Sequence, residues 1–285
     1  MIYKAVIFDL DGTLLDTAKD IMAACNYTLK KYGYAPLDES LLRTKVTAGM
    51  REMLKLGVKK ELWETSGIET FMRDCFANYY KEHIADTTIP FNGIENLIKT
   101  LHSHGIKTAV VTNKYKDMAD KVLSKFEFCK NFKLVLGCDS LTHSKPHPEP
   151  ILTAMQKLQV KACETLYVGD HLNDIKAATA AHTDSAIALW GYGIYECPNV
   201  DTWGGTYKVK EVSSLVEAYK IDASFVVNIE DSNLMYTTHY FGSDSIENGT
   251  IDKGPLKGLD SNNAIRELGG YLFNAGYGVS IEDSN

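Results

Sequence analysis

Two aspartates stand two places apart where the first apolar run of the chain ends. The stretch FDLDGTLLDT, residues 8–17, places Asp9 and Asp11 directly after the apolar run at 4–8. Side chains at positions i and i+2 of a strand point the same way, so we expect the two carboxylates to lie side by side. Carboxylates this close do not both stay ionised without compensation. A cation between them, or a proton on one of them, is expected, and both arrangements suit phosphoryl transfer.

Gly12 follows the acid pair and permits a tight turn, with its amide facing the phosphoryl oxygens. Two other interpretations of this stretch have to be weighed. D-x-D-G resembles the start of a calcium-binding loop, but the glycine comes too early and no glutamate closes a twelve-residue loop. The second alternative is that Asp9 and Asp11 have no chemical role and lie at a strand end exposed to solvent. The polar residues that follow the later apolar runs argue against this alternative.

Polar side chains also follow the later apolar runs. VVTNK carries Thr112 and Asn113, SKPHPEP carries Lys145, and LYVGDHLND carries Asp170 and Asp174. Asp174 also suits the first turn of the helix that follows, as a capping residue. Ligands bind beyond the carboxyl ends of the strands in open α/β sheets, so we expect these side chains to meet there. Acids, a hydroxyl and a lysine together suit a phosphate and a hard metal ion.

A parallel sheet covered by helices has to position these residues. Short apolar runs predict strands buried on both faces, at 4–8, 107–112, 133–137, 165–170 and 185–189. Helical patterns lie between them, at 93–105, 115–126, 149–160 and 172–181. Strands that alternate with helices predict an α/β fold with a doubly wound, Rossmann-like parallel sheet.

Two segments depart from this alternation. Residues 17–86 show helical patterns alone and are predicted to form an inserted helical domain, connected through 13–17 and 86–92. The core is then formed by residues 1–16 and 87–220. Residues 221–285 are predicted to be an α+β extension of unknown role, with strands in 223–241, a loop-like stretch at 245–262 and a helix in 262–276.

Composition excludes some classes of protein. The net charge of −7 disfavours nucleic acid and membrane surfaces as partners, because either would favour a basic face. No apolar stretch is long enough to span a bilayer. Asp9 and Asp11 interrupt the first apolar run, so the N-terminus does not resemble a signal peptide. The six cysteines show no C-x-x-C spacing and predict reduced thiols in a cytoplasmic protein.

Four motifs together resemble those of a known superfamily. DLDGTLLDT, VVTNK, SKPHPEP and YVGDHLNDI are similar, in this order, to the four motifs of the haloacid dehalogenase superfamily. The likeness covers about residues 3–215. Residues 17–86 resemble the α-helical cap of that superfamily, and LLRTKVTAGMREML and LWGYG are similar to its phosphoglycolate phosphatase branch.

This resemblance implies a role for each catalytic residue. Asp9 would be the nucleophile that forms an aspartyl-phosphate. Asp11 would be the general acid for the leaving alcohol and then the base that activates water. Thr112 and the backbone of Asn113 would hold phosphoryl oxygens, and Lys145 would balance the charge on Asp9 and the phosphoryl group.

The resemblance also implies a cofactor. Mg²⁺ would be bound by the Asp9 carboxylate, the Asp11 carbonyl and Asp170, with Asp174 in support. Arg51, in AGMREML, is similar to the substrate arginine of the β-phosphoglucomutases and is therefore a candidate substrate-binding residue. It does not decide between the phosphoglycolate phosphatase branch and the β-phosphoglucomutase branch. A solvated helix position is the alternative for Arg51.

The leading functional prediction is a Mg²⁺-dependent phosphatase that acts on a small phosphorylated metabolite, with phosphoglycolate as the best single guess. A phosphomutase of the β-phosphoglucomutase type is the first alternative, because its chemistry starts in the same way. The second alternative assigns residues 221–285 to assembly or partner binding, including oligomerisation.

Overall fold

The computed structural model describes residues 3–219, 246–247 and 250–251. Residues 3–219 belong to one compact unit, and the other four described residues belong to a second. In that second unit, β9 (Ile246–Glu247) pairs antiparallel with β10 (Thr250–Ile251). The prediction of a loop-like stretch at 245–262 is therefore wrong for these four residues. The strands and the helix predicted at 223–241 and 262–276 lie outside the described residues.

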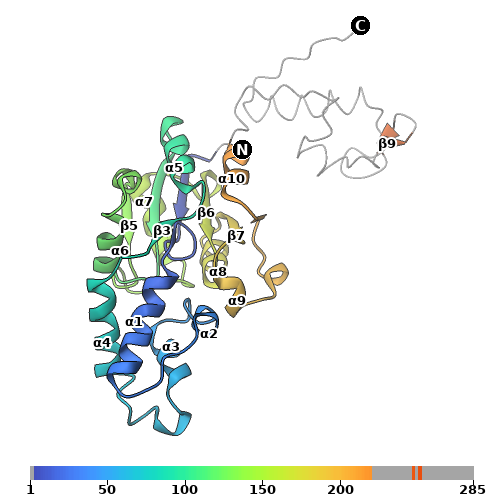
Figure 1. Ribbon diagram of the computed structural model, residues 1–285. Helices are drawn as coiled ribbons and strands as arrows, with labels where there is room; N and C mark the ends of the chain where they lie inside the picture. Colours follow the sequence, from blue (N-terminus) through green and yellow to red (C-terminus); the bar gives the residue numbers. More distant parts are fainter. Residues whose placement is uncertain (1–2, 220–245, 248–249, 252–285) are drawn as a thin grey trace. The chain divides into compact units, whose positions relative to one another are not determined.

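A six-stranded parallel sheet forms the centre of the larger unit (Figure 1). Its strands, in spatial order, are β5 (Leu134–Leu136), β4 (Lys107–Val111), β1 (Ala5–Phe8), β6 (Thr165–Gly169), β7 (Asp184–Ala188) and β8 (Tyr207–Val209). Phe8 of β1 is in register with Val110 on one side and Val168 on the other. The residues that follow these three central strands therefore lie at one edge of the sheet.

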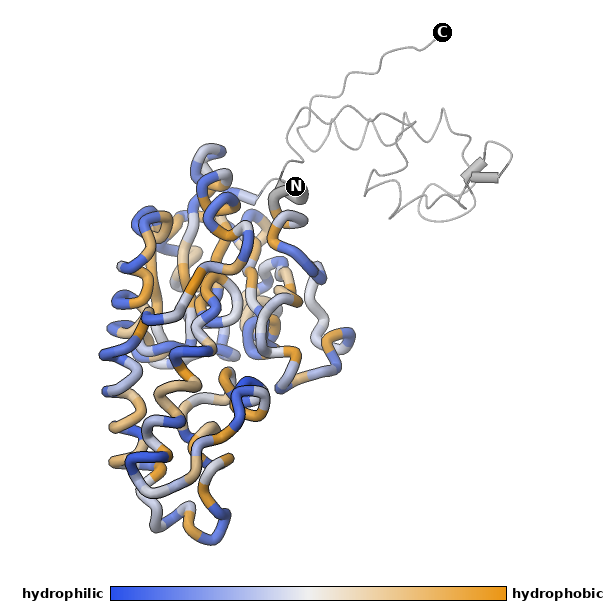
Figure 2. The backbone as a smooth tube through the Cα atoms, viewed as in Figure 1, coloured by the Kyte–Doolittle hydropathy of each residue, from blue (hydrophilic) through white to orange (hydrophobic). Residues whose placement is uncertain are grey.

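Both faces of the sheet are covered, as the continuous apolar runs predict. Val6 and Phe8 of β1 belong to one buried cluster, and Ala5 and Ile7 belong to another. Figure 2 shows hydrophobic residues along the interior of the larger unit. The covering helices are α5 (Ile94–Ser103), α6 (Lys116–Leu123), α7 (Glu149–Leu158), α8 (Leu172–Ala180), α9 (Gly193–Glu196) and α10 (Val212–Tyr219). Short 3₁₀ helices lie at Lys60–Leu62, Glu127–Asn131, Ala162–Glu164 and Val200–Thr202.

The inserted segment is helical, as expected, and gathers at one end of the sheet (Figure 1). Its helices are α1 (Ala18–Lys31), α2 (Glu39–Arg43), α3 (Met50–Gly57) and α4 (Phe71–Glu82). The two connections pair with each other, because β2 (Leu15–Asp16) runs antiparallel to β3 (Ile89–Pro90). The buried Asp20 carboxylate accepts hydrogen bonds from the backbone and hydroxyls of Thr87 and Thr88. These contacts fix where the insert leaves and rejoins the sheet.

The predicted α/β class is confirmed, and so is each of the five predicted strands to within about one residue. Strand β8 was not predicted, because Tyr207 and Lys208 are exposed at the sheet edge and form no apolar run. Among the described residues, no helix is long and apolar enough to cross a membrane. All six cysteines are free thiols, as expected.

Candidate active site

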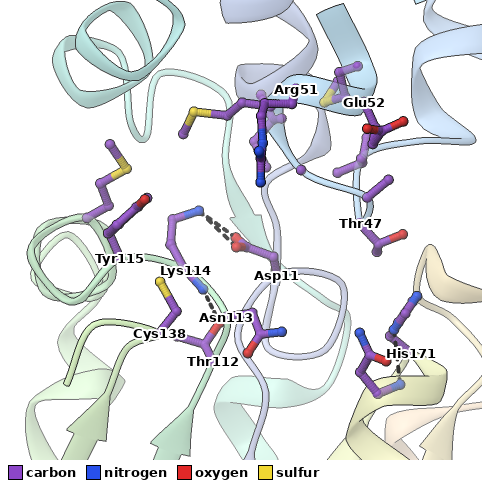
Figure 3. A pocket seen from close by; sticks show the side chains of 18 of the residues that line it. Asp11, Thr47, Arg51, Glu52, Thr112, Asn113, Lys114, Tyr115, Cys138 and His171 are labelled. Atoms are coloured by element: carbon purple, nitrogen blue, oxygen red, sulfur yellow. Dashed lines mark hydrogen bonds and ion pairs between the residues drawn. The ribbon is translucent and has the colours of Figure 1, made fainter. Parts of the chain in front are cut away.

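The residues singled out in the sequence gather where the central strands end. A cleft of ≈ 430 Å³ lies between these strand ends and the helical insert. Asp9, Asp11, Thr112 and Lys145 line it from the side of the sheet. Figure 3 shows the cleft, with Arg51 on the opposite side from Asp11 and Lys114. The strand ends of the sheet and the helical insert therefore contribute residues to one site.

Three buried carboxylates form the floor of this site. Oxygens of Asp9, Asp170 and Asp174 all lie within 4.8 Å of one another, and all three residues are buried. Burial raises the pKa of Asp9 to about 6, although Lys145 opposes the shift. Burial, with the nearby charges of Asp9 and Asp174, raises the pKa of Asp170 to about 8. The full negative charge of this cluster is therefore unfavourable without a cation.

Lys145 supplies one positive charge to the cluster. Its Nζ lies 2.8 Å from Oδ1 of Asp9 and 2.6 Å from Oδ1 of Asp174, and its side chain is 2% exposed. It also donates to the hydroxyl of Tyr167 at 2.9 Å. Burial opposes its charge, but Asp174 and Asp9 outweigh burial and raise the pKa of Lys145. One ammonium group does not neutralise three ionised carboxylates, so the charge of the cluster favours the binding of a further cation.

The donor set fits a hard divalent ion. Oδ1 of Asp9 is buried and has no well-formed hydrogen bond, in spite of its ion pair with Lys145. Asp170 is held in place by Thr13 Oγ1 at 3.0 Å and by the backbone N–H groups of Tyr192 and Gly193 at 2.8 and 3.1 Å. Carboxylate oxygens in a fixed arrangement are the ligands that Mg²⁺ prefers.

Gly12 allows the backbone to pass close to Asp170. It has a φ of +86°, and a Cβ at this position would lie 2.3 Å from Oδ2 of Asp170. Its N–H donates to the carbonyl of Leu15 at 3.0 Å. The expectation that this amide faces phosphoryl oxygens is therefore corrected, because the turn already uses the donor.

Asp174 caps a helix, as one interpretation of the sequence predicted, and it also lies in the acid cluster. Its Oδ2 accepts from the backbone N–H of His171 at 3.0 Å and so caps α8. Its Oδ1 accepts from Lys145 and from the Tyr167 hydroxyl at 3.2 Å. The residue both begins the helix and belongs to the acid cluster.

The Asp11 carboxylate does not belong to the cluster that contains Asp9, and this corrects the expectation that the two carboxylates of the opening motif share one cation or one proton. Nζ of Lys114 lies 2.9 Å from both carboxylate oxygens of Asp11 (Figure 3). Thr17 Oγ1 donates to Oδ1 of Asp11 at 2.7 Å. Asp11 therefore pairs with Lys114, whereas Asp9 pairs with Lys145, which also pairs with Asp174.

Thr112 and Asn113 lie at the end of β4. Thr112 is buried, lines the cleft and accepts from the N–H of Lys114 at 3.2 Å. The Asn113 side chain donates to the Lys145 carbonyl at 2.9 Å and accepts from the Lys145 N–H at 3.1 Å. Asn113 thus ties the segment that carries Lys145 to the end of the neighbouring strand.

The insert contributes Arg51 of α3 and Tyr80 of α4 to the cleft. Arg51 is exposed, and its guanidinium pairs with Glu69 at 2.9 Å. Tyr80 is 2% exposed, and its hydroxyl has no well-formed hydrogen bond within residues 3–219. Nζ of Lys114 lies 4.5 Å from the centroid of the Tyr80 ring.

Lys114 and Tyr80 line the cleft but were not among the residues predicted for the site. Lys114 stands directly after Thr112 and Asn113 in VVTNK. Its position at the end of a predicted strand could therefore have identified it as a site residue. Tyr80 gave no such signal, because it lies in the amphipathic pattern of a helix and faces the cleft only through the packing of the insert.

A second group of potential ligands lies on the surface. His143, His147 and Glu149 also place ligand atoms within 4.8 Å of one another, and both histidines are exposed. Their imidazole nitrogens suit zinc-like ions rather than Mg²⁺. Among the described residues, the carboxylate cluster is the arrangement that fits a hard cation and adjoins the cleft.

Comparison with known proteins confirms the resemblance in the motifs. Residues 6–188 match the family described as haloacid dehalogenase-like hydrolase. A phosphoglycolate phosphatase from Xylella fastidiosa is 35% identical over 200 residues, which are 70% of this chain and 86% of that protein. An N-acetylmuramic acid 6-phosphate phosphatase from Pseudomonas aeruginosa is 33% identical over 214 residues, 75% of this chain and 93% of that protein.

Solved structures share the fold. A predicted phosphoglycolate phosphatase from Haemophilus somnus has a TM-score of 0.66 at 24% identity, covering 76% of this chain and 97% of that one. A haloacid dehalogenase-like family hydrolase from Streptococcus pneumoniae has a TM-score of 0.64 at 22% identity, covering 76% and 98%. With the motif residues gathered at the strand ends, the chain belongs to the haloacid dehalogenase-like hydrolase family and is an enzyme that hydrolyses phosphoric monoesters.

Proposed function

We propose that the protein is a Mg²⁺-dependent phosphatase that hydrolyses a small phosphomonoester of the phosphoglycolate kind through an aspartyl-phosphate. One observation carries this proposal: Asp9 belongs to the buried acid cluster and lines the cleft, and its Oδ1 lies 2.8 Å from Nζ of Lys145 without a well-formed hydrogen bond. A carboxylate attacks a phosphate dianion only when positive charge screens their repulsion.

Asp9 is the nucleophile in this proposal. Its carboxylate oxygen attacks phosphorus, the ester P–O bond breaks, and the phosphoryl group is held on Asp9. Thr112 and the backbone at Asn113 hold phosphoryl oxygens at the end of β4. Lys145 keeps its charge beside Asp9 and screens the incoming dianion.

Asp11 transfers the protons. It gives a proton to the leaving oxygen in the first step, and in the second step it takes a proton from the water that attacks the aspartyl-phosphate. Lys114 holds both of its carboxylate oxygens, and Thr17 holds one, so the group is fixed at the edge of the cleft. This arrangement keeps Asp11 apart from the buried cluster and in the lining of the cleft, where the leaving group would lie.

Asp9, Asp170 and Asp174 would hold Mg²⁺, together with the carbonyl of Asp11. When bound, Mg²⁺ supplies positive charge that neutralises the phosphoryl oxygens. Thr13 and the N–H groups of Tyr192 and Gly193 keep the Asp170 carboxylate oriented for this role.

The helical insert, residues 17–86, would be the cap of the core formed by 1–16 and 87–220. Its residues Arg51 and Tyr80 line the cleft opposite the strand ends. The paired connections β2 and β3 are the natural hinge of such a cap. Closure of the cap excludes bulk water during the first transfer, and opening releases the alcohol.

Release of inorganic phosphate from phosphoglycolate, with and without Mg²⁺, tests this function. Free phosphate is expected as the product, it depends on Mg²⁺, and EDTA stops its release. The absence of Mg²⁺-dependent release from phosphoglycolate and from a panel of other phosphomonoesters would contradict the proposal. Formation of an isomerised sugar phosphate without free phosphate would instead indicate a mutase.

A larger sugar phosphate is the second candidate substrate. The Pseudomonas relative is named for N-acetylmuramic acid 6-phosphate, and the cleft of ≈ 430 Å³ falls in the range that drug-sized ligands occupy. A comparison of kcat/KM for phosphoglycolate and N-acetylmuramic acid 6-phosphate decides between them. We expect the smaller ester to be preferred.

A further inference from the structure

Two histidines and a glutamate gather on the surface, between the end of β5 and the first turn of α7. His143, His147 and Glu149 place ligand atoms within 4.8 Å of one another. The ring centroids of the two histidines are 4.1 Å apart, and both residues line one hollow of the surface. The proposed mechanism gives this surface histidine group no role.

A tight turn brings the two histidines together. The N–H of His147 donates to the Ser144 carbonyl at 3.0 Å, which returns the chain toward His143. Pro146 and Pro148 restrict the backbone of this turn, so the chain loses little entropy when a ligand fixes it. The two imidazoles are therefore held near each other before any ligand binds.

The Glu149 carboxylate is directed at one of the rings. Its Oε2 accepts from the backbone N–H of His143 at 2.7 Å and lies 2.9 Å from Nδ1 of the same residue. These contacts hold the pKa of Glu149 below its ordinary value, so the carboxylate is ionised. The backbone N–H of Glu149 donates to Nδ1 of His147 at 3.2 Å and orients the second ring.

Two imidazoles and a carboxylate suit a transition-metal ion better than Mg²⁺, which prefers oxygen ligands alone. Bonds of about 2.0–2.2 Å to tetrahedral zinc place ligand atoms roughly 3.3 Å apart. The side chains of His143 and Glu149 are 54% and 31% exposed, so they can rotate to close the remaining distance. The ion would replace the hydrogen bonds at the two rings, and water can satisfy the exposed N–H of Glu149.

We propose that His143, His147 and Glu149 bind one Zn²⁺-like transition-metal ion, at a site separate from the acid cluster of the cleft. Lys145 lies between the two histidines in the sequence, and its buried Nζ reaches Asp9 at 2.8 Å. An ion held by both histidines ties the segment that carries Lys145 to the first turn of α7. Its role is structural, because it steadies the backbone from which Lys145 reaches the cleft.

Calorimetric titration of the full chain with Zn²⁺, after removal of metal with EDTA and dialysis, tests the site. Excess Mg²⁺ is present to compete for the carboxylates of the cleft. We expect one Zn²⁺ per chain with a Kd of about 1 µM, since three protein ligands converge on it. His143→Ala and His147→Ala should each weaken binding by at least about 100-fold, because even the loss of a group that only orients a ligand costs 10–100-fold.

His83→Ala is the matched control. His83 is also exposed, and its Nδ1 lies 2.7 Å from a carboxylate oxygen of Asp86, but the described residues place no second imidazole in a ligand group with it. This variant should keep the zinc affinity of the unsubstituted chain. Asp170→Asn should keep it too, because Asp170 belongs to the acid cluster.

Hydrogen–deuterium exchange tests the structural role. Zn²⁺ should slow exchange across residues 142–149 in the unsubstituted chain and leave it unchanged in His143→Ala, because the ion closes this segment onto α7. Exchange that Zn²⁺ does not slow in the unsubstituted chain would overturn the structural role.

Two results of the titration would overturn the site itself. One is a Kd weaker than about 100 µM, or an equal Kd in the unsubstituted chain and both histidine variants. The other is loss of zinc binding in Asp170→Asn, which would place the ion in the acid cluster. Neither measurement needs turnover, so a failure of phosphate release contradicts the proposed function alone.

Discussion

Lys114 donates to both carboxylate oxygens of Asp11 at 2.9 Å, and this pair lies apart from the Asp9 cluster. Asp9 pairs instead with Lys145 at 2.8 Å, a lysine that it shares with Asp174. The repulsion expected between the two acids of the opening motif is thus relieved by separate lysines, Lys114 shortly after β4 and Lys145 in the segment between β5 and α7. The separation gives the two carboxylates different surroundings, which suits one as nucleophile and the other as proton carrier.

The Lys114–Asp11 pair predicts that Lys114 is needed for turnover. We expect Lys114→Met to lower kcat for phosphoglycolate by about 100-fold, because Asp11 loses the group that orients it for proton transfer. Lys114→Arg keeps a positive donor and retains a larger share of the activity. Lys116→Met is the control, since Lys116 is partly exposed and pairs with Asp120 on its own helix. Equal kcat in Lys114→Met and the unsubstituted enzyme would remove this role.

Gly12 predicts a specific cost for an added methyl group. Gly12→Ala places a Cβ 2.3 Å from Oδ2 of Asp170 at a φ of +86°. We expect the free energy of unfolding to fall by about 1–3 kcal/mol from the backbone alone, with a further loss from the clash. Gly33→Ala is the control, because Gly33 has a φ of +83° but nothing lies within 4 Å of its added Cβ. Equal losses in urea unfolding would contradict a role for the Asp170 contact.

The raised pKa values of the acid cluster predict how stability depends on pH without metal. The pKa of Asp9 is raised to about 6 and that of Asp170 to about 8, so the metal-free folded protein holds more protons than the unfolded chain. The stabilisation that these extra protons give the folded protein is fully present below pH about 4, the ordinary pKa of an aspartate. It is lost as the pH rises through 6 and 8. In EDTA, the free energy of unfolding should therefore fall from pH 5 to pH 8.

Mg²⁺ should reverse much of this loss, because it binds the deprotonated carboxylates. The gain in melting temperature on adding Mg²⁺ is expected to be larger at pH 8 than at pH 6, and Asp170→Asn should abolish most of it. A gain that is equal at both pH values, or that survives Asp170→Asn, would show that the ion binds elsewhere. His143→Ala, in the exposed group, is the control that leaves the gain unchanged.

Removal of residues 221–285 tests the prediction that they serve assembly rather than catalysis. Every candidate site residue lies between Asp9 and Asp174, and the family match ends at residue 188. The shortened chain should keep its kcat, and size-exclusion chromatography should show a smaller assembly than the full chain forms. A loss of activity at unchanged native mass would assign these residues to catalysis.

The position of the acid cluster could be predicted from the sequence for a simple physical reason. Parallel strands end at the same edge of a sheet, so acids after β1 and β6 and a hydroxyl after β4 meet once the strands are recognised. The continuous apolar runs identified those strands without knowledge of their order. In the sheet, β1 lies between β4 and β6, and this order explains why Asp9 lies between the residues that follow those two strands.

The side-chain pairings could not be predicted in the same way. The direction in which Asp11 points depends on Lys114, which follows a strand remote in the sequence. The place of Tyr80 in the cleft depends on the packing of the insert against the core. Such contacts are set by tertiary structure, and neither spacing nor periodicity in the chain records them.

The proposed mechanism requires Asp9 to carry the phosphoryl group. The most direct measurement is phosphate release by Asp9→Asn, with Asp120→Asn as an exposed control and circular dichroism to establish that each variant is folded. We expect a folded Asp9→Asn protein with no measurable turnover and an Asp120→Asn protein with normal turnover. Turnover by folded Asp9→Asn at the rate of the unsubstituted enzyme would contradict the proposed mechanism.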